Sequence, residues 1–350
     1  MSNNHVLNHT PIRTSISYKI NDLTIKNLTL PTEMKKFEEI STSYNDKLEV
    51  SSKTPDVSLV YGAGEVLQDN MNEYCNSSYT LNSKEHGGEF EVTYIFDDNN
   101  TELSNYLEIN ADKDMNVTVI YRSKTELPCH HNFIMRTNVA SSAKVHVEIV
   151  NLLNKDTNHF VSIENTVEKQ SDLELVLVDM GAKYSVTNLY SNIVGAEANV
   201  NTNTIYIGQG EDVKDMNYIA HLRGEKCVAD MELQGVLTDK STKNLKFTID
   251  FKTGCTGAKG RENESCMLLS DDASYRSLPI LLCTEDDVEG AHSAAAGQVD
   301  PGQLFYIMSR GFEKKEAIKM LVKAKYNEIT EKIIDEALRK EVLEEIDRRL

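Results

Sequence analysis

Short segments in which apolar and polar residues alternate recur along most of the chain, from about residue 89 to about residue 282. Alternation with a period of two is typical of a β-strand that buries one face and exposes the other. Polar, turn-rich stretches separate the segments, and no long helical pattern interrupts them. The clearest segments are Phe90–Phe96, Val117–Ile120, Val145–Val150, Leu173–Val178, Thr204–Ile207 and Leu245–Ile249. This pattern predicts a mainly β fold built from many short strands.

The spacing of these segments narrows the choice of β architecture. The stronger segments begin near residues 90, 117, 145, 173 and 204, about 27–31 residues apart. That spacing matches one coil of a parallel β-helix, in which successive coils stack over a shared core. A β-sandwich also contains many short strands, but it favours tight hairpins, and the sequence has no Asn-Gly or Asp-Gly pair. The spacing therefore favours the solenoid and leaves the sandwich open.

The chain divides into three regions of different texture. Residues 1–88 form a mixed N-terminal region, in which Thr32–Ile40 has the pattern of one short amphipathic helix. Residues 89–300 carry the alternating segments. From residue 301 to residue 350 the pattern becomes helical: a first helix ends at Gly311, and Thr330 is placed to cap the last one. We expect a β-helix core followed by a C-terminal α-helical segment.

Composition limits the classes of function that this chain can serve. The formal net charge is −18, so the surface repels phosphate backbones and anionic lipid, and we expect no nucleic acid and no membrane partner. No apolar run is long enough to span a bilayer, and the N-terminus lacks the pattern of a signal peptide. These features predict a cytoplasmic protein. The six cysteines, at positions 75, 129, 227, 255, 266 and 283, are then expected to be thiols rather than disulfides.

A series of separate short motifs near the C-terminus carries more information than the strands. It begins with Arg261–Asp271, continues through His292 and Gly297–Asp300, and ends with Leu304–Tyr306 and Ser309–Gly311. In this order the motifs resemble the terminal signature of the SufB/SufD family, the paired subunits of a bacterial iron–sulfur cluster assembly machine. The resemblance covers about the last hundred residues well and the middle strands only in texture. It implies a right-handed parallel β-helix core, and the Gly-Gln-Val-Asp motif at 297–300 is closer to the SufD type.

The resemblance also implies partners. Members of this family pair through the end of the β-helix next to the histidine segment, so we expect a second SufB-like or identical subunit there. Their C-terminal helices dock on a SufC-type ABC ATPase. A cysteine desulfurase system belongs to the same pathway and is expected to be only an indirect partner. By this resemblance, the ATPase-docking segment includes Leu304, Phe305, Tyr306, Arg310 and Gly311. The expected role is that of a non-catalytic subunit.

His292 is the principal candidate for contact with an iron–sulfur cluster, whether transient or shared. It matches the histidine that the family places at the subunit interface, and imidazole and thiolate are normal ligands of iron. Cys266, Cys283 and Cys255 are the accompanying candidates, and a coil of about 27 residues would stack Cys266 on His292. Two departures matter: Ser293 replaces a glutamate of scaffold-type relatives, and Gly290 replaces a cysteine of partner-type relatives. An ordinary buried histidine is the alternative for His292.

Several other functions are compatible with parts of the sequence. Within the family, the chain could be the SufB-like cluster scaffold itself. Outside it, a β-helix carbohydrate-active enzyme or a purely structural solenoid would show the same strands, although no set of grouped carboxylates emerges from the spacing. The glycine-rich segment Gly254–Gly260 lacks the Lys-Ser/Thr ending of a phosphate-binding loop. Cys129, His130 and His131 could begin a metal site, but adjacent strand residues point to opposite faces, which favours a polar turn.

Overall fold

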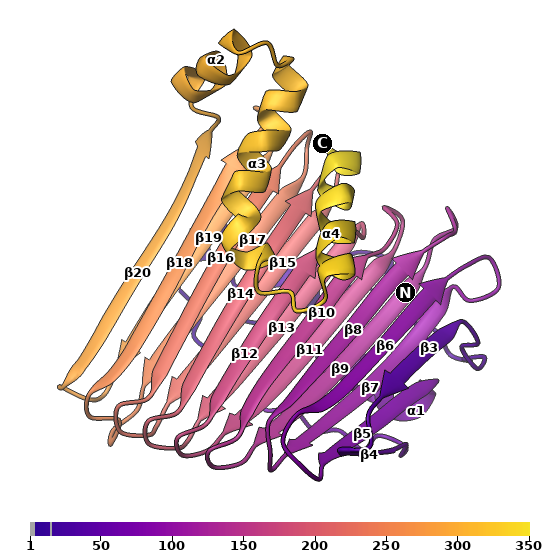
Figure 1. The fold of residues 1–350 in the computed structure, drawn as a ribbon, viewed down its shortest axis with the longest axis vertical. Coiled ribbons are helices and arrows are strands. Elements are labelled where there is room, and N and C mark those ends of the chain that lie inside the picture. Colours follow the sequence, from indigo (N-terminus) through magenta and orange to yellow (C-terminus); the bar gives the residue numbers. More distant parts are fainter. Residues whose placement is uncertain (1–3, 15) are drawn as a thin grey trace.

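The computed structural model describes residues 4–14 and 16–350, and in that part of the chain two sheets of nine strands each make up the core. From β5 (Ser77–Ser83) and β6 (Gly88–Phe96) onward, neighbouring strands of one sheet are two strands apart in the sequence, so the chain alternates between the sheets and forms a solenoid (Figure 1). The first sheet contains β3 (Ile40–Tyr44), β6 (Gly88–Phe96), β8 (Met115–Ser123), β10 (Lys144–Leu152), β12 (Asp172–Asp179), β14 (Asn199–Gly208), β16 (Val228–Leu237), β18 (Ala258–Leu268) and β20 (Val288–Gln298). The second sheet contains β4 (Leu48–Ser51), β5 (Ser77–Ser83), β7 (Glu102–Ala111), β9 (His130–Val139), β11 (Asn158–Val167), β13 (Tyr184–Ile193), β15 (Val213–Leu222), β17 (Thr242–Phe251) and β19 (Ser274–Cys283).

The pairing within each sheet is parallel except at the N-terminal end. There β3 pairs with β6 and β4 with β5 in antiparallel fashion, whereas every later pair of the two sheets is parallel. The parallel β-helix prediction is therefore confirmed. The sandwich alternative is wrong, because coils wind between the sheets instead of folding back as hairpins.

Alternation along each strand places one set of side chains between the sheets. In β10, for example, Val145, Val147 and Ile149 are buried in the core, as the sequence pattern predicts. The equivalent residues of both sheets form one continuous hydrophobic cluster that runs along the solenoid. Stacking in register is what makes this core continuous, since each coil buries its apolar face only against its neighbours.

The N-terminal region covers the outer face of the second sheet. Its elements are β1 (His5–Leu7), a 3₁₀ turn at Ile16–Tyr18, β2 (Leu23–Ile25) and α1 (Glu65–Tyr74). Leu7 and Leu67 pack there against Phe160 of β11 and Val186 of β13. The helix predicted at residues 32–40 is wrong: that segment is extended and leads into β3.

The C-terminal region forms three helices, α2 (Pro301–Ser309), α3 (Lys314–Thr330) and α4 (Glu336–Arg349). Local signals fix their starts: the Asp300 side chain accepts a hydrogen bond from the Gln303 amide at 2.7 Å, and the Asp335 side chain caps α4 in the same way. Thr330 ends α3 and does not begin the next helix, so its predicted role as a cap is wrong.

Helices α3 and α4 lie across the outer face of the first sheet, whereas α2 projects beyond it (Figure 1). Val322 and Tyr326 of α3 and Ile346 of α4 are fully buried in a second apolar cluster with outward-facing strand residues such as Val176 and Ile205. None of the helices in the described residues is long and apolar enough to cross a membrane.

Candidate functional site

The two strands β19 and β20 end the solenoid opposite the N-terminal region. Each has a hydrogen-bonded neighbour on one side only within the described residues, because each stands last in its sheet. The residues of β20 are small and almost all exposed, from Glu289 to Gln298. The free edge of a long strand presents unpaired N–H and C=O groups, which suits this end of the solenoid to pairing with another chain.

His292 lies in the middle of this open edge. Its side chain is exposed, and it makes no hydrogen bond to the described residues. The strand register places His292 directly opposite Glu262 of β18, with Gly290 opposite Gly260. Every second residue of β18 from Ala258 to Cys266 is buried and therefore faces the interior of the solenoid. Because His292 pairs with Glu262, which is one of these residues, His292 lies on the interior side of β20. The alternative of an ordinary buried histidine is wrong.

Cys266 does not stack on His292. Its partner on β20 is Ala296, four residues along the strand from the histidine. The last coil is longer than the predicted 27 residues: Lys259 pairs with Glu289, a difference of 30 positions. The expected stacking is therefore wrong, because the added residues shift the register of the final strand.

The protonation state of the Cys266 thiol also disfavours metal binding. It is buried, and burial raises its pKa to about 11, an effect that the Tyr206 hydroxyl and the Lys243 ammonium only partly offset. Metal ligation requires the thiolate. Cys266 therefore fits a core position better than a ligand position.

A cluster of polar groups lies beside Cys266 inside the last coils. The carboxylate of Glu264 accepts a hydrogen bond at 2.8 Å from each of the hydroxyls of Tyr206 and Tyr275, and it forms an ion pair with Lys243. Both charged side chains are fully buried, and the Lys243 ammonium lies 3.9 Å from the centre of the Tyr275 ring. These contacts satisfy the Glu264 carboxylate, whereas the Lys243 ammonium has the ion pair but no hydrogen-bond partner among the described residues.

Glu262, two residues earlier on the same face of β18, differs sharply. Its side chain is fully buried, and neither carboxylate oxygen has a hydrogen-bond partner among the described residues. Burial raises its pKa to about 8, and the backbone N–H groups of Ile249 and Ile280, which approach the carboxylate without reaching hydrogen-bond geometry, only partly oppose this effect. Sequence analysis missed Glu262, but the alternation of Glu262, Glu264 and Cys266 along one strand was a signal that all three face inward.

The other two cysteines lie at a corner of the terminal coils. Cys255 is fully buried, and burial raises the pKa of its thiol, with a further contribution from the nearby Glu285 carboxylate. Cys283 ends β19, is exposed, and pairs in register with Phe251. No group of three or more His, Cys, Asp or Glu side chains in residues 4–14 and 16–350 is arranged to hold a metal ion. The predicted set of four ligands is thus dispersed over the end of the solenoid.

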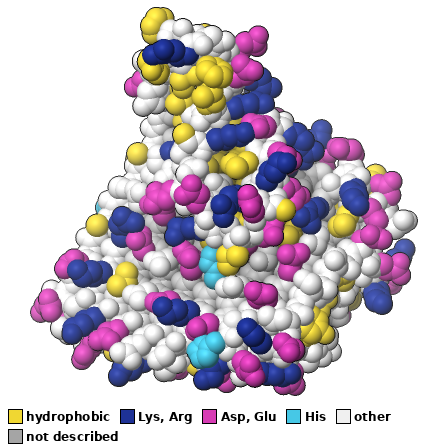
Figure 2. All heavy atoms as spheres, viewed as in Figure 1, with side chains coloured by type: hydrophobic (Ala, Val, Ile, Leu, Met, Phe, Trp, Pro, Cys, Tyr) yellow, Lys and Arg dark blue, Asp and Glu magenta, His cyan; other side chains and the backbone are white. Residues whose placement is uncertain are grey.

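The residues predicted to dock the ATPase gather on α2. Phe305 is 74% exposed and Tyr306 58% exposed, and the Arg310 guanidinium stacks 5.1 Å from the centre of the Tyr306 ring. Leu304 is half-buried, and Gly311 ends the segment with a φ of +99°, which a glycine adopts without strain. Met308, Phe312 and Met320 extend the apolar surface, and Figure 2 shows hydrophobic side chains gathered at this tip of the molecule.

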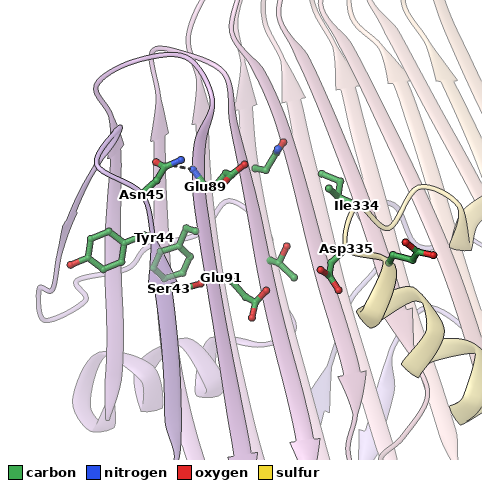
Figure 3. A pocket seen from close by; sticks show the side chains of 11 residues that line it. Ser43, Tyr44, Asn45, Glu89, Glu91, Ile334 and Asp335 are labelled. Atoms are coloured by element: carbon green, nitrogen blue, oxygen red, sulfur yellow. Dashed lines mark hydrogen bonds between the residues drawn. The ribbon is translucent and has the colours of Figure 1, made fainter.

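A groove of about 520 Å³ lies at the other end, between the N-terminal strands and the turn that joins α3 to α4. Figure 3 shows its lining, which includes Tyr44, Glu89, Glu91, Ile334 and Asp335. Acidic side chains of β6 and of the start of α4 contribute to this lining. The groove is remote from β20, the strand that carries His292 (Figure 1), and none of the predicted site residues lines it.

Comparison with known proteins decides the family. The model of the SufBD core domain, described as SUF system FeS cluster assembly, matches residues 94–325. That span is about two thirds of the chain. The chain belongs to the SufBD family. The matched region runs from β6 into α3 and includes His292 and α2, so the terminal motifs and the strands are parts of one family domain.

Individual proteins that are similar to this chain in sequence also carry the name SufD or SufBD family. The iron–sulfur cluster assembly protein SufD of Bacillus subtilis is 25% identical over 265 residues, which cover 74% of this chain and 60% of the relative. A SufBD family protein of Pyrococcus horikoshii is 32% identical over 130 residues, 37% of this chain and 29% of the relative. SufD of Escherichia coli is 26% identical over 164 residues, 47% of this chain and 38% of the relative. This SufBD chain therefore spans at most about three fifths of these relatives in the matched regions.

Proposed function

We propose that this chain is a SufD-like, non-catalytic subunit of a cytoplasmic SUF iron–sulfur cluster assembly complex. In this role it pairs with a SufB-like or identical subunit through β19 and β20, and it binds a SufC-type ATPase through α2. A cysteine desulfurase system would supply sulfur to the complex as a whole. The observation that carries the proposal is the pair of unsatisfied surfaces, an open β edge bearing His292 and an exposed aromatic tip, on a fold of the SufBD family.

The open edge supports the pairing. Small side chains along β20 let another backbone approach closely, and the free outer edge of this eleven-residue strand offers a long ladder of hydrogen-bonding groups. A substitution of Ala294 by arginine puts a bulky charge on this edge. We expect it to convert a pair into monomers in analytical ultracentrifugation, while Asp112→Arg at a remote turn leaves the pair intact. Pairing that survives Ala294→Arg would count against this interface.

The aromatic tip supports ATPase binding. Exposed aromatic side chains on a short helix are typical anchors of a protein interface. Phe305→Ala and Tyr306→Ala should each weaken capture of the ATPase from the same genome by about tenfold or more. Val60→Ala, another exposed apolar site, is the control. Unchanged capture by both α2 variants would reject the docking proposal. Point variants are preferable to removing the C-terminal segment, because α3 and α4 cover a large apolar face of the solenoid.

The alternative within the family is that this chain is the cluster scaffold, with the cluster as its cargo. The exposed imidazole of His292 favours contact with a cluster, whereas the buried thiol of Cys266 does not provide a second ligand. We propose that a cluster is at most shared with the paired subunit. Anaerobic reconstitution of the isolated chain with iron and sulfide tests this: the absence of a stable charge-transfer absorbance is expected, and a stoichiometric cluster would favour the scaffold.

A further inference from the structure

A pocket of about 440 Å³ lies between the N-terminal region and the outer face of the second sheet. Its polar lining comes from Asn244 of β17, Arg276 of β19 and, in the N-terminal region, Arg13, Lys19 and Asp22. The charged side chains of this lining are three cations and one carboxylate, in a protein whose formal net charge is −18. A concave surface that gathers positive charge on an acidic protein attracts an anion.

Asn244 gives the pocket a buried polar group that lacks a partner. The residue is 5% exposed, its Nδ2 donates to Oδ2 of Asp215 at 3.2 Å, and its Oδ1 has no hydrogen-bond partner among the described residues. Asp215 is fully buried in an ion pair with Lys246, and an ionised carboxylate only accepts hydrogen bonds. Asp215 therefore holds the NH₂ group of Asn244 toward itself and leaves the amide oxygen for a donor. The pocket that Asn244 lines is where a ligand can bring that donor.

Two of the cations are available to the same ligand. Arg276 is exposed, lies directly opposite Asn244 in the strand register, and makes no ion pair within the part of the chain that the structure describes. Lys19 is exposed and equally without an ion pair there, and its φ of +50° is uncommon for a lysine. Arg13 differs, because the carboxylate of Asp22 lies 3.0 Å from its guanidinium. Arg276 and Lys19 thus supply the charge that the lining itself does not neutralise.

Hydrogen bonds hold the N-terminal wall of the pocket against the sheet. Nδ2 of Asn217 on β15 donates to the backbone oxygen of His9 at 2.7 Å. Asn21 accepts a hydrogen bond from the backbone N–H of Thr14 at 2.9 Å and donates one to its carbonyl at 2.6 Å. Because these bonds keep the wall in place, a ligand does not have to order it.

We propose that this pocket binds a small phosphorylated molecule that also carries a hydroxyl group. Arg276 and Lys19 bind the phosphate, since a guanidinium fork matches two phosphate oxygens and an ammonium adds a point charge. The amide oxygen of Asn244 accepts the hydrogen bond of the hydroxyl. The volume lies within the range of small-molecule sites. None of these three residues lies on α2 or β20, so the inference does not rest on the proposed function.

Isothermal titration calorimetry of the purified chain tests the pocket, at low ionic strength and pH 8. The probes are glycerol 3-phosphate and methyl phosphate, two phosphate monoesters of which only the first carries hydroxyl groups. We expect saturable binding of glycerol 3-phosphate, and binding of methyl phosphate that is weaker by about fivefold or more, because it offers no donor to Asn244. Arg276→Gln and Lys19→Gln should each weaken glycerol 3-phosphate binding by about fivefold or more. Lys26→Gln is the matched control, because Lys26 is an exposed lysine of the same N-terminal region that does not line the pocket.

Each contrary result removes a stated part of the proposal. Absence of saturable binding, or undiminished binding by either Arg276→Gln or Lys19→Gln, would overturn the site. An equal loss with Lys26→Gln would also overturn it, because the effect would then be one of general surface charge. Equal affinities for the two probes would overturn the role of Asn244. Thermal unfolding checks the fold: both pocket variants should melt as the unaltered chain does, and glycerol 3-phosphate should raise the melting temperature only of the unaltered chain and of Lys26→Gln.

Discussion

Nε2 of His146 lies 3.0 Å from Oε1 of the fully buried Glu148, on the outer face of the first sheet. The same carboxylate oxygen accepts a hydrogen bond at 2.6 Å from the backbone N–H of Ile334, in the turn between α3 and α4. On its other side the imidazole meets Glu174 at 3.2 Å, and Glu174 also binds Lys332 of that turn. Glu148 and Glu174 thus hold the turn between α3 and α4 to the solenoid, and His146 bridges the two carboxylates.

Stability should therefore depend on pH through His146. Burial alone would lower its pKa, but the hydrogen bonds to Glu148 and Glu174 raise it to about 9. Because the pKa is raised above the unfolded value, the stabilisation is complete below about pH 6.5 and is lost as the pH rises through about 9. Urea unfolding should show a loss of roughly 2–3 kcal/mol over this interval, and His146→Gln should remove that dependence. His86→Gln, at an exposed ion pair with Asp114, should keep the slope.

The interior ion pair of Lys243 and Glu264 should matter for folding more than a surface pair does. Lys243→Met leaves a buried carboxylate without its counter-ion and should cost about 3–5 kcal/mol in the free energy of unfolding. Adding Glu264→Gln should recover much of this loss, because the buried charge is then gone. Lys259→Met, at the exposed pair with Glu289, should cost less than about 1 kcal/mol. Equal losses for Lys243→Met and Lys259→Met would contradict the burial argument.

Gly235 makes room for the ring of Tyr206. A Cβ atom at position 235 would lie 1.9 Å from Cζ of that ring, which is fully buried and whose hydroxyl binds Glu264. Gly235→Ala should therefore destabilise the protein by about 1–3 kcal/mol through overpacking. Gly297→Ala is the control, since a Cβ there meets no atom within 4 Å. Calorimetric melting of the two variants compares them directly, and similar melting temperatures would sink this explanation.

The cysteines should differ strongly in reactivity. Cys283 is exposed, whereas Cys129, Cys227, Cys255 and Cys266 are buried and burial raises the pKa of each thiol. Under native conditions iodoacetamide should modify Cys283 first, with the buried thiols reacting only as the chain unfolds. Peptide mass spectrometry at successive times measures the order. Early labelling of Cys266 would show that the end of the solenoid opens in solution.

The local sequence pattern was sufficient to predict an element correctly where one face of that element is buried and the other is exposed to solvent. Val145–Val150 alternates and is a strand, β10. The pattern failed at residues 32–40, because Phe37 is held in an extended segment by edge-to-face packing on Phe96, with ring centres 5.2 Å apart. A distant aromatic contact of this kind overrides local helical preference.

The site was harder to predict than the fold for two physical reasons. Charged residues such as Glu262 and Lys243 are expected in water, yet the strand pattern places them in the core. The stacking of Cys266 and His292 depended on the length of one coil. The pairing spans 30 positions and the two residues are 26 apart, so the four added residues move the histidine by that amount along the neighbouring strand. Turn length carries no periodic signal.

The two ends of the solenoid differ in strand length and direction, and this asymmetry bears on how many molecules can join by strand addition. One end finishes in β20, a parallel strand of eleven residues, and the other in β3 and β4, antiparallel strands of five and four residues. In the proposed pair, joined at the long strands, only the short reversed strands would face outward, and these offer little template for a third molecule. Under that proposal, growth by strand addition would stop at two molecules, although a solenoid with two identical long edges could in principle continue as a fibre.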